Sequence, residues 1–196
     1  MINSLRRLTE RVSRGWIVAA LAVPSVLLMA LFNFHPAAVP ALLKAGNGTP
    51  PLDIQLGYGP ADIESLLTTY GTEGRQRYAA FLAVDLVYAV CYGLFLAGLL
   101  RLLLRPPVSR ADSRWNDLCL LPLFAGAADC VENVCILILI GIYPTVPAPL
   151  AYLASTATLV KWTLAAIALL SILVAFVARM YLWATLPRRG ADATPR

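Results

Sequence analysis

The sequence predicts an all-α fold, a four-helix transmembrane bundle with a long extracytoplasmic loop between the first two helices. Hydrophobic residues make up 59% of the 196 residues and charged residues only 14%, a composition that is too apolar for a water-soluble domain. The apolar residues fall into four runs of membrane-spanning length. Residues 1–186 are therefore expected to form one membrane domain, with helices near residues 16–34, 78–104, 118–143 and 150–183.

The first span and the loop after it are the least regular part of the chain. A basic segment followed by residues 16–34 is also typical of a signal peptide, but the run is longer than a usual signal core and favours a retained helix. Pro24 is expected to kink this helix. Residues 35–77 form a loop rich in Pro and Gly. Within this loop, residues 60–70 are predicted to form a short helix that ends at Gly71 and covers the bundle.

The distribution of basic residues predicts the orientation. Arginines gather in the amino-terminal segment, in the connection between the second and third spans, and after the fourth span, whereas the other two connections hold only Lys44, Arg75 and Arg77. By the positive-inside rule both termini are cytoplasmic, in a multi-pass protein of the cell's inner membrane. The carboxyl-terminal tail, residues 187–196, is expected to be disordered. Because the arginines flank apolar spans, they do not indicate nucleic-acid binding.

The third span carries two acids, Asp129 and Glu132, within an otherwise apolar run. An ionisable side chain costs several kcal/mol at membrane depth, so it normally faces the interior of a bundle, a partner or water. Asp129 and Glu132 share one helix face because they are three residues apart. The short turn 144–149 separates Glu132 from Lys161, and both lie at equal distances in sequence from its ends. If the third and fourth spans are antiparallel neighbours, the two charges meet.

The second span contributes a polar stripe at helical spacing, made of Tyr78, Asp85, Tyr88 and Tyr92. Tyrosines in such a stripe are also ordinary packing residues, and Tyr78 suits the aromatic belt at the membrane surface. Counted from the arginines, the polar groups of all three spans fall in the outer half of the bilayer. We expect one polar cavity there, and its candidate ligand-binding residues are Asp85, Tyr88, Tyr92, Asp129, Glu132, Asn133 and Lys161.

Two simpler interpretations of this set stay open. In the first, Glu132 and Lys161 form a structural ion pair, while the other acids hydrogen-bond to tyrosines and to the backbone. In the second, Lys161 extends to the outer membrane interface. No residue pattern indicates a catalytic reaction or a cofactor. A metal site is not expected either, because His35 is the only histidine and the four cysteines lack ligand spacing.

The glycine and acid patterns resemble those of a known group of proteins. The chain resembles small uncharacterised four-span bacterial integral membrane proteins in one pattern of residues. This pattern consists of Gly71, Gly74, Arg75 and Tyr78, followed by Asp85 and by the run Ala128–Asn133. This resemblance implies the four-span topology and no activity. In architecture alone, the bundle is also similar to the sterol-isomerase and sigma-2-receptor superfamily.

Three functions are compatible with these features. The first is binding of a lipid-like or cationic small molecule in the acidic cavity, with or without chemistry. The second is a proton- or cation-coupled permeation unit, which the apolar inner half of the spans disfavours. The third is a non-catalytic bundle that assembles with itself or with a membrane partner, through small residues such as Gly93, Gly126 and Ala168. Membrane lipid is the one partner that all three share.

Overall fold

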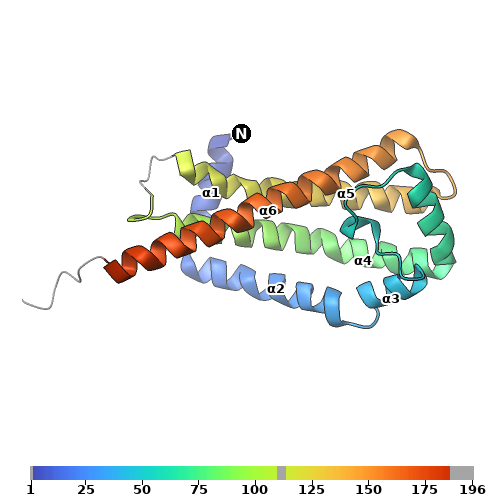
Figure 1. Cartoon of the computed structure of the whole chain (residues 1–196), viewed down its shortest axis with the longest axis horizontal. Helices are drawn as coiled ribbons and strands as arrows, with labels where there is room; N and C mark the ends of the chain where they lie inside the picture. Colours follow the sequence, from blue (N-terminus) through green and yellow to red (C-terminus); the bar gives the residue numbers. More distant parts are fainter. Residues whose placement is uncertain (1, 110–113, 186–196) are drawn as a thin grey trace, which may run out of the picture.

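The chain forms a bundle of helices with a small folded cap at one end, as the computed structural model shows (Figure 1). The structure describes residues 2–109 and 114–185, and within these ranges the regular structure is helical throughout. The predicted disordered tail, 187–196, lies outside the described residues. Four helical segments in the described ranges are long and apolar enough to cross a membrane, namely Gly15–Ala45, Pro60–Leu103, Arg114–Ile142 and Ala148–Thr185. These spans are those of a multi-pass membrane protein.

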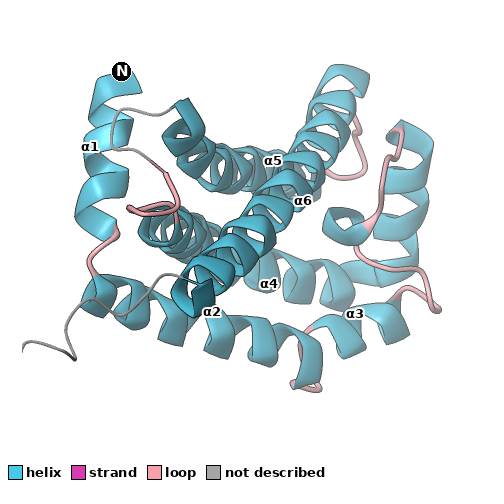
Figure 2. Ribbon diagram, turned by 60° about the vertical axis from the view of Figure 1, so that its left-hand side comes forward, coloured by secondary structure: helices cyan, strands magenta, loops and turns pink. Residues whose placement is uncertain are grey.

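The helices of the bundle are α2 (Gly15–Phe34), α4 (Pro60–Leu103), α5 (Leu121–Ile142) and α6 (Ala148–Thr185). A short 3-10 helix, η2 (Arg114–Leu120), leads directly into α5. Helix α5 packs against both α4 and α6, and α2 lies along α4 (Figure 2). Helix α5 is therefore central, which is why its polar side chains can be buried.

Helix α4 contains a sharp bend at Gly71, where the sequence predicts a helix end. Gly71 has φ 60° and ψ −172°, a conformation that glycine adopts without a Cβ clash, and the helix resumes directly after it. The Arg75 guanidinium group donates to the Leu67 carbonyl across the bend at 2.9 Å and lies 4.3 Å above the Tyr143 ring. The helix that contains the predicted second span, 78–104, thus resumes just after Gly71 and ends at Leu103.

The region predicted as an irregular loop, residues 35–77, is largely folded. It contains α3 (Val39–Ala45), the 3-10 helix η1 (Leu52–Ile54) and the first turns of α4. Leu42, Leu52, Ile63 and Leu67 are fully buried in its apolar core, which continues into the bundle. We call residues 39–70 the cap. Burial of these leucines and of Ile63 holds the cap against the ends of the spans.

A further helix, α1 (Ile2–Val12), lies at the end of the bundle opposite the cap (Figures 1 and 2). It was not expected, because its sequence is highly charged and short. Its backbone approaches α4 closely, since a Cβ added to Gly98 would lie only 2.7 Å from the Val12 carbonyl oxygen. The same end of the molecule holds the carboxyl end of α4 and the start of η2, and we call it the arginine end.

Helices α4 and α5 approach closely through paired glycines. A Cβ on Gly126 would lie 2.6 Å from the Ala89 carbonyl oxygen, and one on Gly93 would lie 3.1 Å from the Pro122 carbonyl oxygen. Ala97 and Ala168 are likewise fully buried within the chain. The small residues therefore serve contacts inside this bundle.

Candidate functional site

The centre of the site is an ion pair between α5 and α6. The Lys161 ammonium nitrogen lies 2.6 Å from Glu132 Oε2 and 3.2 Å from Asp129 Oδ1. Glu132 is fully buried and Lys161 is 7% exposed, so the lysine does not extend to the interface. The predicted contact between Glu132 and Lys161 is confirmed. It forms because the short connection between α5 and α6 makes them antiparallel neighbours and sets both residues at one level.

Hydroxyl groups complete the surroundings of Glu132. The Thr158 hydroxyl donates to Glu132 Oε1 at 2.6 Å, and the Tyr58 hydroxyl lies 3.0 Å from Thr158 Oγ1. Since Thr158 has one hydroxyl proton, its bond to Glu132 leaves Tyr58 as the donor to Thr158. The Tyr58 backbone N–H donates to Ser155 Oγ at 3.0 Å. A hydrogen-bonded row therefore connects the cap to the buried carboxylate.

The cap contributes a fourth acid, Asp53 of η1, to the same interior. Its backbone carbonyl accepts hydrogen bonds from Lys161 Nζ at 3.1 Å and from Trp162 Nε1 at 3.3 Å. Its carboxylate accepts one from the Tyr78 hydroxyl at 2.8 Å. Tyr78 is fully buried rather than placed in an interfacial belt. Asp53 thus fastens the cap to the ammonium group.

Asp85 and Asn133 form a second polar pair, between α4 and α5. Asn133 Nδ2 donates to Asp85 Oδ2 at 2.7 Å. The other amide atom, Asn133 Oδ1, is buried and has no hydrogen-bond partner in the described part of the chain, and Asn133 is fully buried. An unpaired buried acceptor costs about 1–3 kcal/mol, so this atom is poised to accept from a donor group.

The remaining predicted tyrosines differ in their roles. The Tyr92 hydroxyl hydrogen-bonds to Asp129, as expected for a polar stripe. Tyr88 packs against the rings of Phe32 and Tyr92, with ring centroids 5.4 Å and 5.0 Å away, and forms no hydrogen bond to a described acid. Of the predicted residues, Tyr92, Asp129, Glu132 and Lys161 therefore form one hydrogen-bonded group. Asp85 and Asn133 form a separate pair, and Tyr88 hydrogen-bonds to neither.

Sequence reasoning missed Asp53, Tyr58, Ser155 and Thr158. The sequence position of Thr158 indicated that it could join the site, because it precedes Lys161 by one helical turn and shares its face. The indication for Asp53 was weaker, since it is a single charged residue between Leu52 and Ile54. Nothing in the sequence placed Tyr58 at Thr158. We call Asp53, Asp85, Asp129, Glu132 and Lys161 the acidic cluster.

The acidic cluster holds four carboxyl groups and one ammonium group. Lys161 contacts Asp129, Glu132 and the Asp53 carbonyl, whereas Asp85 has no cationic partner among the described residues. Neutralisation of this acid requires a proton or a cationic guest. Within the described ranges, no three His, Cys, Asp or Glu side chains are arranged to hold a metal ion.

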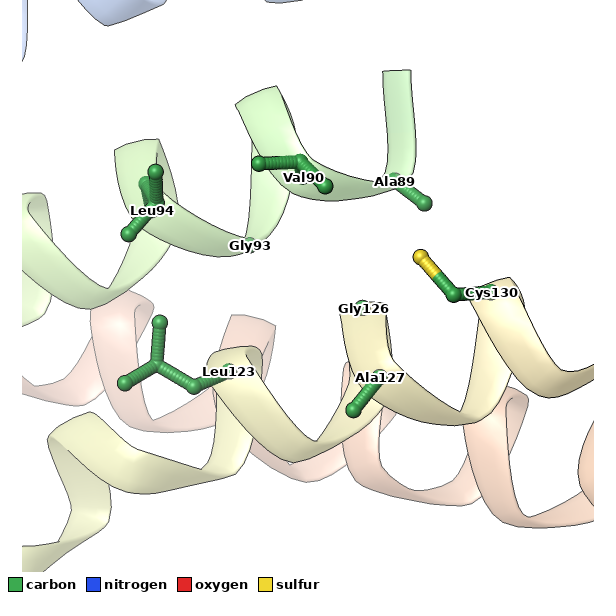
Figure 3. Close-up of a pocket in the computed structure, with 8 residues that line it drawn as sticks. All are labelled: Ala89, Val90, Gly93, Leu94, Leu123, Gly126, Ala127 and Cys130. Carbon is green, nitrogen blue, oxygen red and sulfur yellow. The ribbon is translucent and has the colours of Figure 1, made fainter. Parts of the chain in front are cut away.

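A cavity of about 220 Å³ lies in the groove between α4 and α5 (Figure 3). Its lining is apolar and consists of Ala89, Val90, Gly93, Leu94, Leu123, Gly126, Ala127 and Cys130. A cavity lined by the acids stays a prediction; none of them lines this groove, and Asp129 and Glu132 contact Lys161. Ala89 follows Asp85 by one turn on the same face of α4, so the groove begins where the polar pair ends.

No protein-family model, curated protein or solved structure matches this chain. The function is therefore inferred from the site alone.

The pH dependence of stability is a direct test of the buried cap acid. Burial raises the pKa of Asp53 above its ordinary value of 3.8, and the nearby Lys161 ammonium group only partly opposes this. The folded state therefore binds the Asp53 proton more tightly than the unfolded state does. Protonated Asp53 therefore contributes to the stability of the fold. This stability is fully present below the pKa that Asp53 has in the unfolded state, and it is lost as pH rises through the higher pKa of the folded state.

We expect the melting temperature of the wild type, minus that of Asp53→Asn, to fall as pH rises from about 4 to about 8. Thermal unfolding in detergent at a series of pH values measures it. Glu73→Gln is the control, because the Glu73 side chain is 79% exposed and pairs only with Arg77 on the surface. A difference that stays constant or grows with pH would contradict the assignment.

Proposed function

We propose that this protein binds a lipid-like cationic molecule, with its apolar part in the groove between α4 and α5 and its positively charged head at Asp85 and Asn133. The observation that carries the proposal is the position of the groove. The lining of the apolar cavity begins at Ala89, one helical turn from Asp85, a buried carboxyl group without a cationic partner among the described residues. A molecule with an apolar chain and a cationic head matches both halves.

The head is expected to be an ammonium group that carries N–H donors. Its charge would compensate Asp85, and its N–H would satisfy Asn133 Oδ1, the buried acceptor that lacks a partner. Asp129 and Glu132 are less suitable, because Lys161 already occupies them. The proposal therefore gives Asp85 and Asn133 the binding role and gives Glu132, Asp129 and Lys161 the role of holding α5 and α6.

A proton- or cation-coupled pathway receives less support from the described residues. The hydrogen-bonded groups extend from Tyr58 in the cap to Tyr92 in α4. From there toward the arginine end, the buried positions of α4 are apolar or glycine, at Gly93, Ala97, Gly98, Leu100 and Leu103. Relay of charge across the whole membrane would need polar groups along this half.

The orientation belongs to the same proposal. Apart from Arg75 and Arg77 near the cap, the described arginines gather at one end of the bundle. By the positive-inside rule this end faces the cytoplasm of a cell that holds the protein in its inner membrane. The cap and the acidic cluster then lie toward the outside.

Binding of dodecylamine to the full-length protein in phosphatidylcholine nanodiscs tests the proposal. We expect saturable binding of radiolabelled dodecylamine that dodecanol does not compete away, since the alcohol lacks the charge. Asp85→Asn, which keeps the shape and the bond to Asn133, should weaken binding about tenfold, corresponding to about 1.4 kcal/mol.

A second variant tests the groove itself. Ala127 is exposed and lines the cavity, so Ala127→Phe fills it without touching the acids and should also weaken dodecylamine binding about tenfold. Ala166→Phe is the matched control, because Ala166 is exposed on α6 and outside the groove. Wild-type affinity in Asp85→Asn or in Ala127→Phe would overturn the proposal.

A further inference from the structure

Helix α1 presents a row of arginines away from the bundle. Arg7 and Arg11 lie four residues apart on one face of α1, and Arg14 follows the helix as the residue that precedes α2; all three are exposed. The opposite face of α1 carries Thr9 and Val12, which are 3% and 8% exposed and face the bundle. We call Arg7, Arg11 and Arg14 the arginine row.

Four other arginines of this end form contacts within the chain. Arg6 pairs with Asp117 through two hydrogen bonds of 2.8 Å, and Arg101 contacts Glu10 at 3.3 Å. Arg105 donates to Ser13 at 3.0 Å, and Arg179 donates to the Leu103 carbonyl at 3.2 Å. These contacts fasten α1, α4, η2 and α6 together.

The arginine row has no such use. Arg7 makes only a 3.4 Å contact to Ser4 within its own helix, and Arg11 and Arg14 have no hydrogen-bond or ion-pair partner among the described residues. The two acids on the described part of this end, Glu10 and Asp117, are occupied by Arg101 and Arg6. Within the described residues, these three guanidinium groups therefore have no counter-charge.

The level of the row in the bundle identifies its partner. Arg14 immediately precedes Gly15, where the membrane-spanning part of α2 begins, and Val12 packs on Gly98 near the end of the α4 span. Groups at this level meet lipid headgroups, and guanidinium groups bind phosphate oxygens in a bidentate manner. A basic residue near an anionic membrane surface contributes about 1 kcal/mol.

We infer that the arginine row, in and just after α1, binds the phosphate headgroups of anionic phospholipids. Helix α1 then lies between the bundle, which holds it by Arg6, Glu10 and Ser13, and the headgroups, which occupy its outer face. This site is separate from the groove between α4 and α5 and does not depend on a ligand there.

The test measures retained phospholipid on the full-length protein. Protein purified in mild detergent is mixed with phosphatidylglycerol or with phosphatidylcholine, and bound lipids are counted by native mass spectrometry. We expect the wild type to retain phosphatidylglycerol in preference to phosphatidylcholine. The triple variant Arg7→Gln, Arg11→Gln and Arg14→Gln should lose this preference, whereas the triple variant with lysine at the same positions should keep most of it.

Controls separate the headgroup site from other causes. Lys44→Gln removes an exposed charge at the cap end and should leave the phosphatidylglycerol preference unchanged. Melting temperatures without added lipid report whether α1 stays docked, since none of the three arginines holds it. Raising the salt concentration should weaken retention in the wild type and have little effect on the glutamine variant. Equal retention by the wild type and the glutamine variant would overturn the inference, as would equal retention of both lipids by the wild type, the outcome expected if the row instead binds an acidic protein.

Discussion

Replacing Lys161 with methionine is expected to lower the free energy of unfolding by about 3–5 kcal/mol. The Lys161 ammonium group is the one cation within reach of Asp129 and Glu132 in the described interior, and the Glu132 side chain is fully buried. The variant leaves these buried carboxyl groups without a counter-charge. Unfolding by heat or denaturant in detergent micelles measures the loss.

Two comparisons make this prediction specific. Lys44→Met removes a lysine that is exposed, and its effect should stay within about 0.5 kcal/mol. Adding Glu132→Gln to Lys161→Met should recover part of the loss, because one of the unpaired acids is gone. The exchange of the two charges, Glu132→Lys with Lys161→Glu, should also recover part of it. A Lys161→Met protein as stable as the wild type would show that the ion pair does not hold α5 and α6 together.

Placing a methyl group at Gly126 is the second change with a large expected effect. In Gly126→Ala the new Cβ would lie 2.6 Å from the Ala89 carbonyl oxygen, a backbone atom that moves only if α4 moves. Overpacking of this kind costs about 1–3 kcal/mol. Since the groove runs along the same pair of helices, dodecylamine binding should weaken as well.

Gly141 gives a matched control in the same helix. A Cβ at Gly141 would meet nothing within 4 Å, so Gly141→Ala should be neutral or stabilise α5 by up to about 1 kcal/mol through helix propensity. Thermal unfolding of both variants in one detergent gives the comparison. Equal stability of Gly126→Ala and Gly141→Ala would mean that α4 and α5 do not depend on glycine contact.

The sequence by itself determined the spans and the polar face of α5. Apolar runs of membrane length have few folds available, because every backbone polar group must be satisfied within the helix. The equal distances of Glu132 and Lys161 from a short turn likewise left one register for an antiparallel pair. Asp129 and Glu132 had to face inward, since lipid offers no partner for a carboxylate.

Only the tertiary structure decided which groups meet the acids from outside the spans. Asp53 and Tyr58 lie in a segment without helical periodicity, and their positions depend on how the leucines of the cap pack on the bundle. The same holds for the close approach of Gly126 to Ala89, beside which the apolar groove runs between α4 and α5. Which residues share one face of a helix depends only on the sequence of one or two neighbouring turns. Contacts such as that of Lys161 with the Asp53 carbonyl join residues far apart in the chain, so only the packed fold defines them.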